Sequence, residues 1–227
     1  MGLLWWVRRH SAILGVQYPY WNSGFDMTTP ARERRRERMR GDIVEATLRL
    51  IEAEGLDGVS IERIAEEAEV ARATIYAHFP EGRDAMLRAA YDAAGAMLVA
   101  DARAGAASIP SWEDRIAHYA RAMIEFSRSP TLGRFYSVTG PALVGFRETG
   151  GAGSRGYRED IRGVLSAAQD VGELAPDADP DALAVLISSS LRDAGIDAAL
   201  NPESAERYVD AVRRILRGLR TVPEESS

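Results

Sequence analysis

The sequence contains no cysteine and no lysine, so all 28 of its basic residues are arginine. Without cysteine the chain can form no disulfide, no thiolate nucleophile and no cysteine-ligated zinc or iron–sulfur site. Without lysine it lacks the usual residue of Schiff-base catalysis and of a phosphate-binding P-loop. Only three histidines are present, His10, His78 and His118, and they lie far apart in the sequence. These absences disfavour an enzyme, and we expect neither a metal site nor a cofactor.

The remaining composition is that of a soluble globular protein. The chain has 227 residues, of which 46% are hydrophobic, enough for one large domain or two small ones. Its net charge of −6 is unevenly distributed: residues 27–41 hold six arginines against two glutamates, whereas residues 91–227 hold 15 arginines against 20 acidic residues. An acidic body with a basic N-terminal arm is typical of a protein that contacts a polyanion at one end, although a solvated helix start gives the same pattern.

The first 26 residues differ in composition from the rest, since they contain three of the four tryptophans. Their apolar run, residues 3–7, is too short to span a membrane, and its charged residues follow it, unlike those of a signal peptide. We interpret residues 1–26 as an extension that is either not native or disordered, with translation beginning at Met27. The alternative is an aromatic anchor at a membrane interface.

From Pro30 onward the apolar residues recur with a helical period. They predict a long first helix that begins near Pro30 and is ended by Gly55. Ser60 offers an N-cap oxygen to a second helix of about two turns, which stops at residues 69–71. A third short helix over 72–79 is stopped by the proline that follows. Two short helices joined by a tight turn, behind a longer supporting helix, are typical of a helix-turn-helix.

A specific signature lies in this region, where residues 64–80 read Ile-Ala-Glu-Glu-Ala-Glu-Val-Ala-Arg-Ala-Thr-Ile-Tyr-Ala-His-Phe-Pro. The run resembles the DNA-binding signature of the TetR (tetracycline-repressor-like) family of bacterial transcriptional regulators, and the resemblance covers residues 29–88 well. It implies an all-α fold with a three-helix helix-turn-helix DNA-binding domain at 27–90. It also implies a C-terminal helical effector-binding and dimerisation domain at 91–222, followed by a tail at 223–227.

The third helix carries residues suited to reading DNA. A recognition helix in the major groove needs small or hydrogen-bonding side chains on its exposed face, and the resemblance implies DNA contacts for Thr74, Tyr76 and His78. Arg72 can reach a guanine or a phosphate, and Ala73 permits close approach. The alternative is a three-helix bundle that binds nothing. The candidate DNA-binding residues are Ser60, Arg72, Ala73, Thr74, Tyr76, His78 and Arg83.

Three positions depart from the family pattern. Glu69 stands where the turn usually has glycine, so it is either strained or simply right-handed. Ala71 replaces the usual serine N-cap of the recognition helix, which removes about 1 kcal/mol of capping. Gly82 is interpreted as a one-residue insertion, and Arg83 as the cation that replaces a phosphate-binding lysine.

The C-terminal half contains further helix starts. Ser111 begins a capping box that opens a helix to about Phe126, and the pairs 179–180 and 201–202 each place a cap residue before a proline. These last two pairs predict helices of about 20 and 18 residues, which the resemblance assigns to a dimeric four-helix bundle. Packing within one chain is the alternative. The candidate dimerisation residues are Leu183, Ile187, Leu191, Val212 and Leu216.

Aromatic residues between these helices are candidates for an effector cavity, although they are equally compatible with a plain core. They are Trp112, His118, Tyr119, Met123, Phe126, Phe135, Tyr136, Phe146 and Tyr157. Residues 151–156 match the dinucleotide fingerprint G-x-G-x-x-G, but no buried strand precedes them, and we interpret them as a flexible loop between helices.

Together these features predict a cytoplasmic, homodimeric transcriptional regulator that binds a palindromic operator on double-stranded DNA and does not associate with membranes. We expect a repressor, released by a small hydrophobic or aromatic effector. A helical DNA-binding protein without an effector, acting architecturally, is the first alternative. An enzyme that uses the cavity within residues 105–175 is the second.

Overall fold

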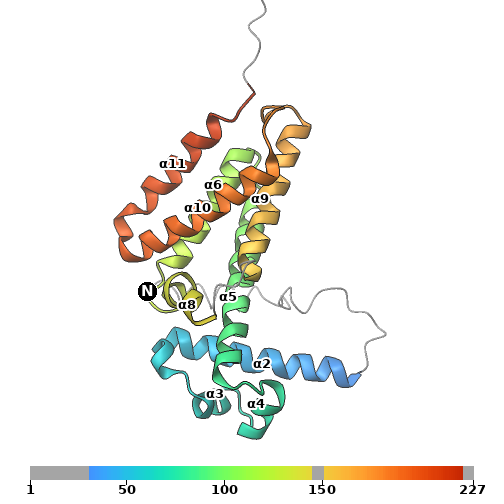
Figure 1. The fold of residues 1–227 in the computed structure, drawn as a ribbon, viewed down its shortest axis with the longest axis vertical. Coiled ribbons are helices and arrows are strands. Elements are labelled where there is room, and N and C mark those ends of the chain that lie inside the picture. The colour runs from blue at the N-terminus through green and yellow to red at the C-terminus, as the bar shows by residue number, and fades with distance from the viewer. Residues whose placement is uncertain (1–30, 145–150, 222–227) are drawn as a thin grey trace, which may run out of the picture.

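Three helices form where the sequence predicts a helix-turn-helix. The computed structural model describes residues 31–144 and 151–221 of the chain. Helix α2 spans Ala31–Glu54, α3 spans Ile61–Glu67 and α4 spans Arg72–His78, and the 3₁₀ turn Leu56–Gly58 joins α2 to α3. These helices pack together at one end of the molecule (Figure 1). The short pair α3–α4 therefore lies against the longer α2, as the helix-turn-helix arrangement requires.

The other helices form a second unit, joined to the first by the long helix α5, Arg83–Ala106. Figure 1 shows α5 leaving the three-helix unit and continuing beside α6 and α9. The second unit consists of α6 (Trp112–Ser127), α7 (Leu132–Arg134), the π-helical turn Phe135–Thr139, α8 (Gly140–Val144), α9 (Ala152–Asp170), α10 (Pro180–Leu200), the 3₁₀ turn Pro202–Ser204 and α11 (Ala205–Arg217). Within the described residues the only extended pairing is the isolated bridge Leu174–Arg220, so the predicted all-α fold is confirmed.

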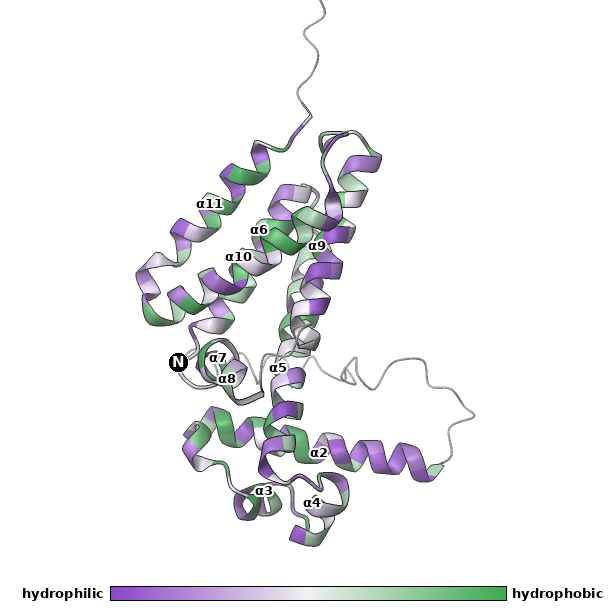
Figure 2. Cartoon of the chain, in the orientation of Figure 1, coloured by the Kyte–Doolittle hydropathy of each residue, from purple (hydrophilic) through white to green (hydrophobic). Residues whose placement is uncertain are grey.

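Both units share one continuous apolar core. Ile43 of α2, Ile75 of α4, Leu98 of α5 and Ile161 of α9 are all buried in the same cluster. Figure 2 shows apolar and polar residues mixed along α5 where it leaves the three-helix unit. Because α5 contributes to both ends of the core, a shift of this helix would also move the residues that pack against it in the helix-turn-helix.

Three of the predicted helix starts are confirmed by their caps. The Ser60 Oγ accepts a hydrogen bond from the Arg63 amide at 3.2 Å, and the Ser111 Oγ accepts one from the Asp114 amide at 3.2 Å. The Asp179 carboxylate accepts from the next two free amides of α10, at 3.0 and 3.1 Å. The last helix is shorter than predicted, because Pro202 opens a 3₁₀ turn and α11 begins only at Ala205.

Glu69 lies in the left-handed backbone region, with a φ of 54°. It belongs to the turn between α3 and α4, where the Val70 amide donates to the Ala65 carbonyl at 2.9 Å and closes the end of α3. Of the two sequence-based alternatives, the strained one is therefore correct. A left-handed conformation costs a residue with a side chain about 1–2 kcal/mol, a cost that glycine avoids.

We expect Glu69→Gly to stabilise the protein by about 0.5–1 kcal/mol, because relief of the strain exceeds the extra chain entropy that glycine loses on folding. The matched control is Glu69→Ala, which removes the carboxylate and keeps the strain. Urea unfolding of both variants measures the difference. Equal free energies of unfolding for the two would show that the left-handed turn stores no strain.

The glycines of residues 151–156 are packing positions rather than a flexible loop, which corrects the sequence-based interpretation. Helix α9 begins at Ala152 and lies against α5. A Cβ atom on Gly153 would lie 2.7 Å from the Gly95 Cα, and one on Gly156 would lie 2.9 Å from a methyl of Val99. These glycines therefore let the backbones of α5 and α9 approach closely.

Two of the predicted dimerisation residues are buried in the chain's own core. Leu191 is 1% exposed and Leu216 is fully buried, and both belong to the main apolar cluster. Leu183, Ile187 and Val212 are half-buried and pack against the same cluster. The large apolar side chains that these two helices expose are different ones, namely Val185, Leu186 and Leu200 of α10 and Ile215 of α11.

Some predictions fall on residues outside the described ranges. They are the interpretation of residues 1–26, the cavity assignment of Phe146 and the tail 223–227. Across residues 31–144 and 151–221, no helix combines the length and apolar character that crossing a membrane requires.

Candidate DNA-binding interface

Helix α4 is held in place by its buried face. Ile75 is fully buried and Phe79 is 1% exposed, and both pack in the cluster that contains Ile64 of α3. Burial of side chains of this size contributes about 1.5–3 kcal/mol each, which fixes the rotation of a helix too short to be stable alone. The opposite face of α4 is therefore the exposed one.

Arg40 of α2 fixes the C-terminal end of α4. Its guanidinium donates a hydrogen bond to the His78 carbonyl at 2.7 Å and lies over the Phe79 ring, 3.9 Å from the ring centroid. A cation is stabilised at a helix C-terminus by the partial negative charge of the last carbonyls, and the aromatic face adds to this attraction. Arg40 is thus a positioning residue for α4, a role that the sequence alone does not reveal.

The exposed face of α4 carries most of the predicted contact residues. Arg72, Ala73 and Tyr76 are exposed, Tyr76 to 51%. Thr74 and His78 are half-buried at the edge of this face. An exposed tyrosine beside small residues on a short helix offers a hydroxyl for phosphate and leaves room for close approach to a groove.

Arg72 is ion-paired in the free protein. Its guanidinium lies 3.1 Å from a carboxylate oxygen of Glu62 in α3, and both side chains are more than half exposed. Such exposed pairs contribute about 0.2–1 kcal/mol, so a base edge or phosphate can replace Glu62 at little cost. The Ala71 N-cap makes no side-chain hydrogen bond, as the sequence predicts.

Two of the predicted DNA-contact residues, Ser60 and Arg83, instead make hydrogen bonds within the protein. The Ser60 hydroxyl caps α3. The Arg83 guanidinium donates to the Val59 carbonyl at 2.7 Å and to the Leu56 carbonyl at 2.9 Å, so it braces the connector between α2 and α3. This arrangement favours a positioning role for Arg83 over the phosphate contact inferred from the sequence. Arg83 also begins α5, preceded by Gly82 at a φ of 70°.

A hollow of about 720 Å³ separates α4 from the N-terminal part of α2. Three arginines of α2, namely Arg32, Arg35 and Arg36, line it opposite Thr74 and His78. No ion pair is found for these three arginines within the described part of the chain. The basic arm is visible in the sequence, but charge alone does not show that α2 reaches the recognition helix.

The imidazole of His78 lies at the edge of this hollow. Burial lowers the pKa of its imidazole, and the guanidinium groups of Arg36 and Arg40 lower the pKa further. Its Nδ1 atom is buried without a hydrogen-bond partner among the described residues. A neutral imidazole can still donate one hydrogen bond to a phosphate, which would then favour its protonated form.

Most of the predicted effector residues belong to the main apolar cluster in the second unit. Trp112, Tyr119, Met123, Phe126, Phe135, Tyr136 and Tyr157 are all buried. The Tyr136 ring stacks on Tyr91 of α5 with centroids 5.0 Å apart, and Phe126 meets it edge-on at 5.5 Å. His118 is half-buried and lies against Gly105 of α5 instead. Through Phe135 and Tyr136, which both contact Tyr91, this aromatic cluster meets the helix that leads to the helix-turn-helix.

A polar cluster links α5, α6 and α9 in the same region. The Arg103 guanidinium of α5 pairs with Asp160 of α9 at 2.7 Å, and the Tyr119 hydroxyl donates to the same carboxylate at 3.0 Å. Burial and the Asp160 charge raise the pKa of Tyr119, so the hydroxyl stays protonated as a donor. Throughout the described ranges, no group of three histidine, aspartate or glutamate side chains is arranged to hold a metal ion.

Comparison with known proteins agrees with this architecture. Residues 43–90 match the family model of bacterial regulatory proteins of the tetR family. No curated protein sequence matches the chain. A TetR-family transcriptional regulator from Pectobacterium atrosepticum has a similar structure, with 22% identity, a TM-score of 0.72, and 84% of this chain and 98% of that one covered.

Two ligand-bound structures are also similar. RolR in complex with resorcinol has 19% identity and a TM-score of 0.64, covering 86% of this chain and 100% of that one. The regulator FadR from Bacillus subtilis in complex with stearoyl-CoA has 14% identity and a TM-score of 0.58, covering 78% and 96%. At these identities the likeness concerns the fold, which the chain shares with TetR-family transcriptional regulators.

Proposed function

We propose that this chain, whose N-terminal helix-turn-helix belongs to the tetR family of bacterial regulatory proteins, is a homodimeric transcriptional regulator that binds a palindromic operator. Residues 27–90 are its DNA-binding domain and residues 91–222 its effector-binding and dimerisation domain. It acts as a cytoplasmic repressor, released from DNA by a small hydrophobic or aromatic effector.

The observation that carries this proposal is the exposed face of α4 beside the arginines of α2. Tyr76 and Arg72 project from a helix that fits a major groove, and Arg32, Arg35 and Arg36 flank it. Each arginine that neutralises a phosphate adds about −0.9 to the slope of log affinity against log salt. The base-reading and phosphate-binding parts therefore lie on one side of the molecule.

Dimerisation is proposed on α10 and α11. The stretch 182–191 contains no charged residue, and its exposed side carries Ala182, Val185, Leu186 and Ser190. A helix face without charge over several turns is unusual at a free surface and typical of an interface core. Two copies joined there can place their recognition helices in successive major grooves, about 34–36 Å apart.

Effector control is proposed to act through α5. The aromatic residues around Tyr91 and Tyr136 contact the same helix whose first turn, at Arg83, braces the helix-turn-helix. A ligand that separates these rings would change the angle of α5, and with it the separation of the two recognition helices. The structural relatives that bind resorcinol and stearoyl-CoA support an apolar or aromatic ligand class for this chain.

The experiment is selection of bound DNA from a randomised pool by the full chain, followed by footprinting. We expect an inverted repeat with half-sites about one helical turn apart. Arg35→Ala and Arg36→Ala should each reduce the salt slope by about 0.9. The matched control is Arg158→Ala, which removes the same charge from the exposed surface of α9. Binding without sequence preference would favour the architectural alternative, and no binding at all would refute the proposal.

A further inference from the structure

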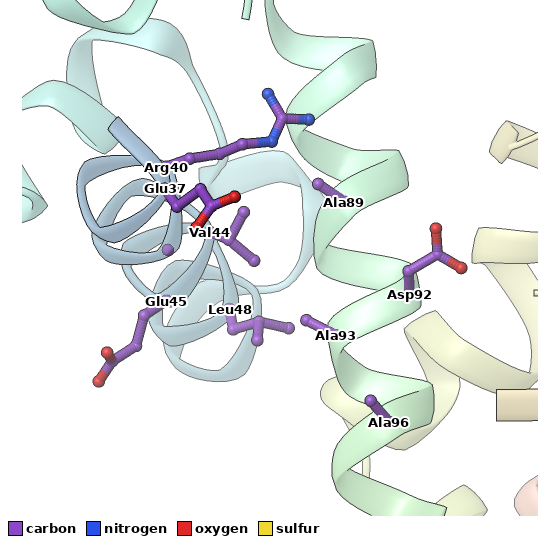
Figure 3. A pocket seen from close by; sticks show the side chains of 10 residues that line it. Glu37, Arg40, Val44, Glu45, Leu48, Ala89, Asp92, Ala93 and Ala96 are labelled. Atoms are coloured by element: carbon purple, nitrogen blue, oxygen red, sulfur yellow. The ribbon is translucent and has the colours of Figure 1, made fainter. Parts of the chain in front are cut away.

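The first two turns of α2, residues 31–38, project from the body of the protein. All of their side chains are exposed except that of Arg34, which is half-buried. Figure 1 shows this end of α2 extending beyond α4. The later turns are anchored instead, and Figure 3 shows Val44 and Leu48 pointing from α2 toward the alanines of α5. Because a helix bends little over this length, the anchored turns set the direction of the projecting ones.

One side of the projecting turns is basic and faces α4. Arg32, Arg35 and Arg36 are three and four positions apart, a spacing that places them on the same side of a helix. They line the hollow beside α4 together with Glu33, so α2 brings three positive charges and one negative charge to it. This net positive charge beside the exposed face of α4 attracts a polyanion to the hollow.

The arginines of α2 lie at increasing distances from α4. Arg40, which binds the His78 carbonyl, marks the end of α4. At a rise of about 1.5 Å per residue, Arg32 lies about 12 Å farther along the axis of α2, and Arg35 and Arg36 lie between the two. With α4 in a major groove, the phosphates that border this groove come first in that direction, and the next minor groove lies behind them. Arg35 and Arg36 therefore suit the phosphates, whereas Arg32 suits the minor groove.

An arginine is chemically suited to that groove. Its guanidinium is planar and more weakly hydrated than an ammonium group, so it loses less hydration on entering a narrow groove. The minor groove of A·T-rich DNA is narrow and has an enhanced negative potential, which attracts inserted arginines. Arg32 is exposed, and its neighbour Ala31 adds no bulk that would keep it out.

We propose that Arg32 enters the minor groove beside each half-site and selects a short A·T-rich stretch there. The operator then has two parts: a half-site read by α4 in the major groove, and a flank read by Arg32 through the width and potential of the minor groove. Arg35 and Arg36 hold the phosphate strand between the two grooves. This inference rests on the proposed DNA-binding function and adds a specificity-determining residue to it.

The test compares the full chain with Arg32→Ala and Arg32→Lys on duplexes that carry the selected half-sites and either A·T or G·C flanks. We expect the unmodified chain to bind the A·T-flanked duplex about tenfold more tightly than the G·C-flanked one. Arg32→Ala should remove this difference while the half-site preference remains. Arg32→Lys keeps the charge, so it should retain the salt slope and still lose most of the flank preference.

The matched control is Arg38→Ala, which removes an exposed arginine of the same turns that does not line the hollow. It should change the affinity for both duplexes alike. Equal affinity of the unmodified chain for the two flanks, or a flank preference that survives in Arg32→Lys, would overturn the inference and make Arg32 a plain phosphate contact. Either result leaves the half-site, and with it the proposed DNA-binding function, in place. Failure of the unmodified chain to select any half-site would overturn both.

Discussion

Leu186→Asp is expected to convert the protein from a dimer to a folded monomer and to lower its affinity for a palindromic operator at least about 100-fold. Leu186 is 64% exposed on the uncharged side of α10, and Ile215 is 63% exposed on α11. A carboxylate placed in the proposed interface would lose its hydration on association without gaining a partner. Analytical sedimentation measures the first effect, and titration of the selected operator measures the second.

The control is Val171→Asp, the same kind of change at a side chain that is 71% exposed beyond the end of α9. It should leave both the dimer and the operator affinity unchanged. Leu191→Asp is unsuitable as a test, because a carboxylate at that buried position would unfold the chain whatever its oligomeric state. A Leu186→Asp protein that remains dimeric would exclude α10 as the interface.

The helix-turn-helix could be predicted from sequence because its signals are local. Ser60 caps α3 through its own first turn, Ile75 and Phe79 recur with the helical period, and the proline after Phe79 stops α4. None of these features needs a distant residue to form. The same holds for Asp179, whose carboxylate binds amides of the helix it begins.

The features that could not be predicted depend on distant parts of the chain. Leu191 and Leu186 both belong to an apolar stretch of α10, and periodicity alone cannot say which one the chain covers. Gly153 matches a nucleotide-binding pattern, yet its role is to let α9 approach Gly95, 58 positions earlier in the chain. Arg40 has no local sign of importance, since its two partners lie in and just after α4.

Tyr76→Ala is expected to weaken binding to every DNA sequence by about 1–3 kcal/mol, whereas Arg72→Ala should flatten the base preference at one position of each half-site. Tyr76 is half-exposed on the outer face of α4, where a hydroxyl can reach the phosphates that border a groove. Arg72 lies at the N-terminal end of the same face, the part of a recognition helix that reaches base edges. Binding to the randomised pool, analysed position by position, separates the two effects.

The structure adds a constraint on Arg72, because its guanidinium, which is proposed to contact DNA, is paired with Glu62 in the free protein. Glu62→Gln should therefore tighten operator binding slightly and sharpen the preference that Arg72→Ala removes. Tyr76→Phe isolates the hydroxyl, and we expect it to reproduce most of the alanine effect without changing the salt slope, since no charge is lost. If the Tyr76 and Arg72 variants both bound DNA like the unmodified chain, the exposed face of α4 would not be the recognition surface, and the arginines of α2 would have to act with another element.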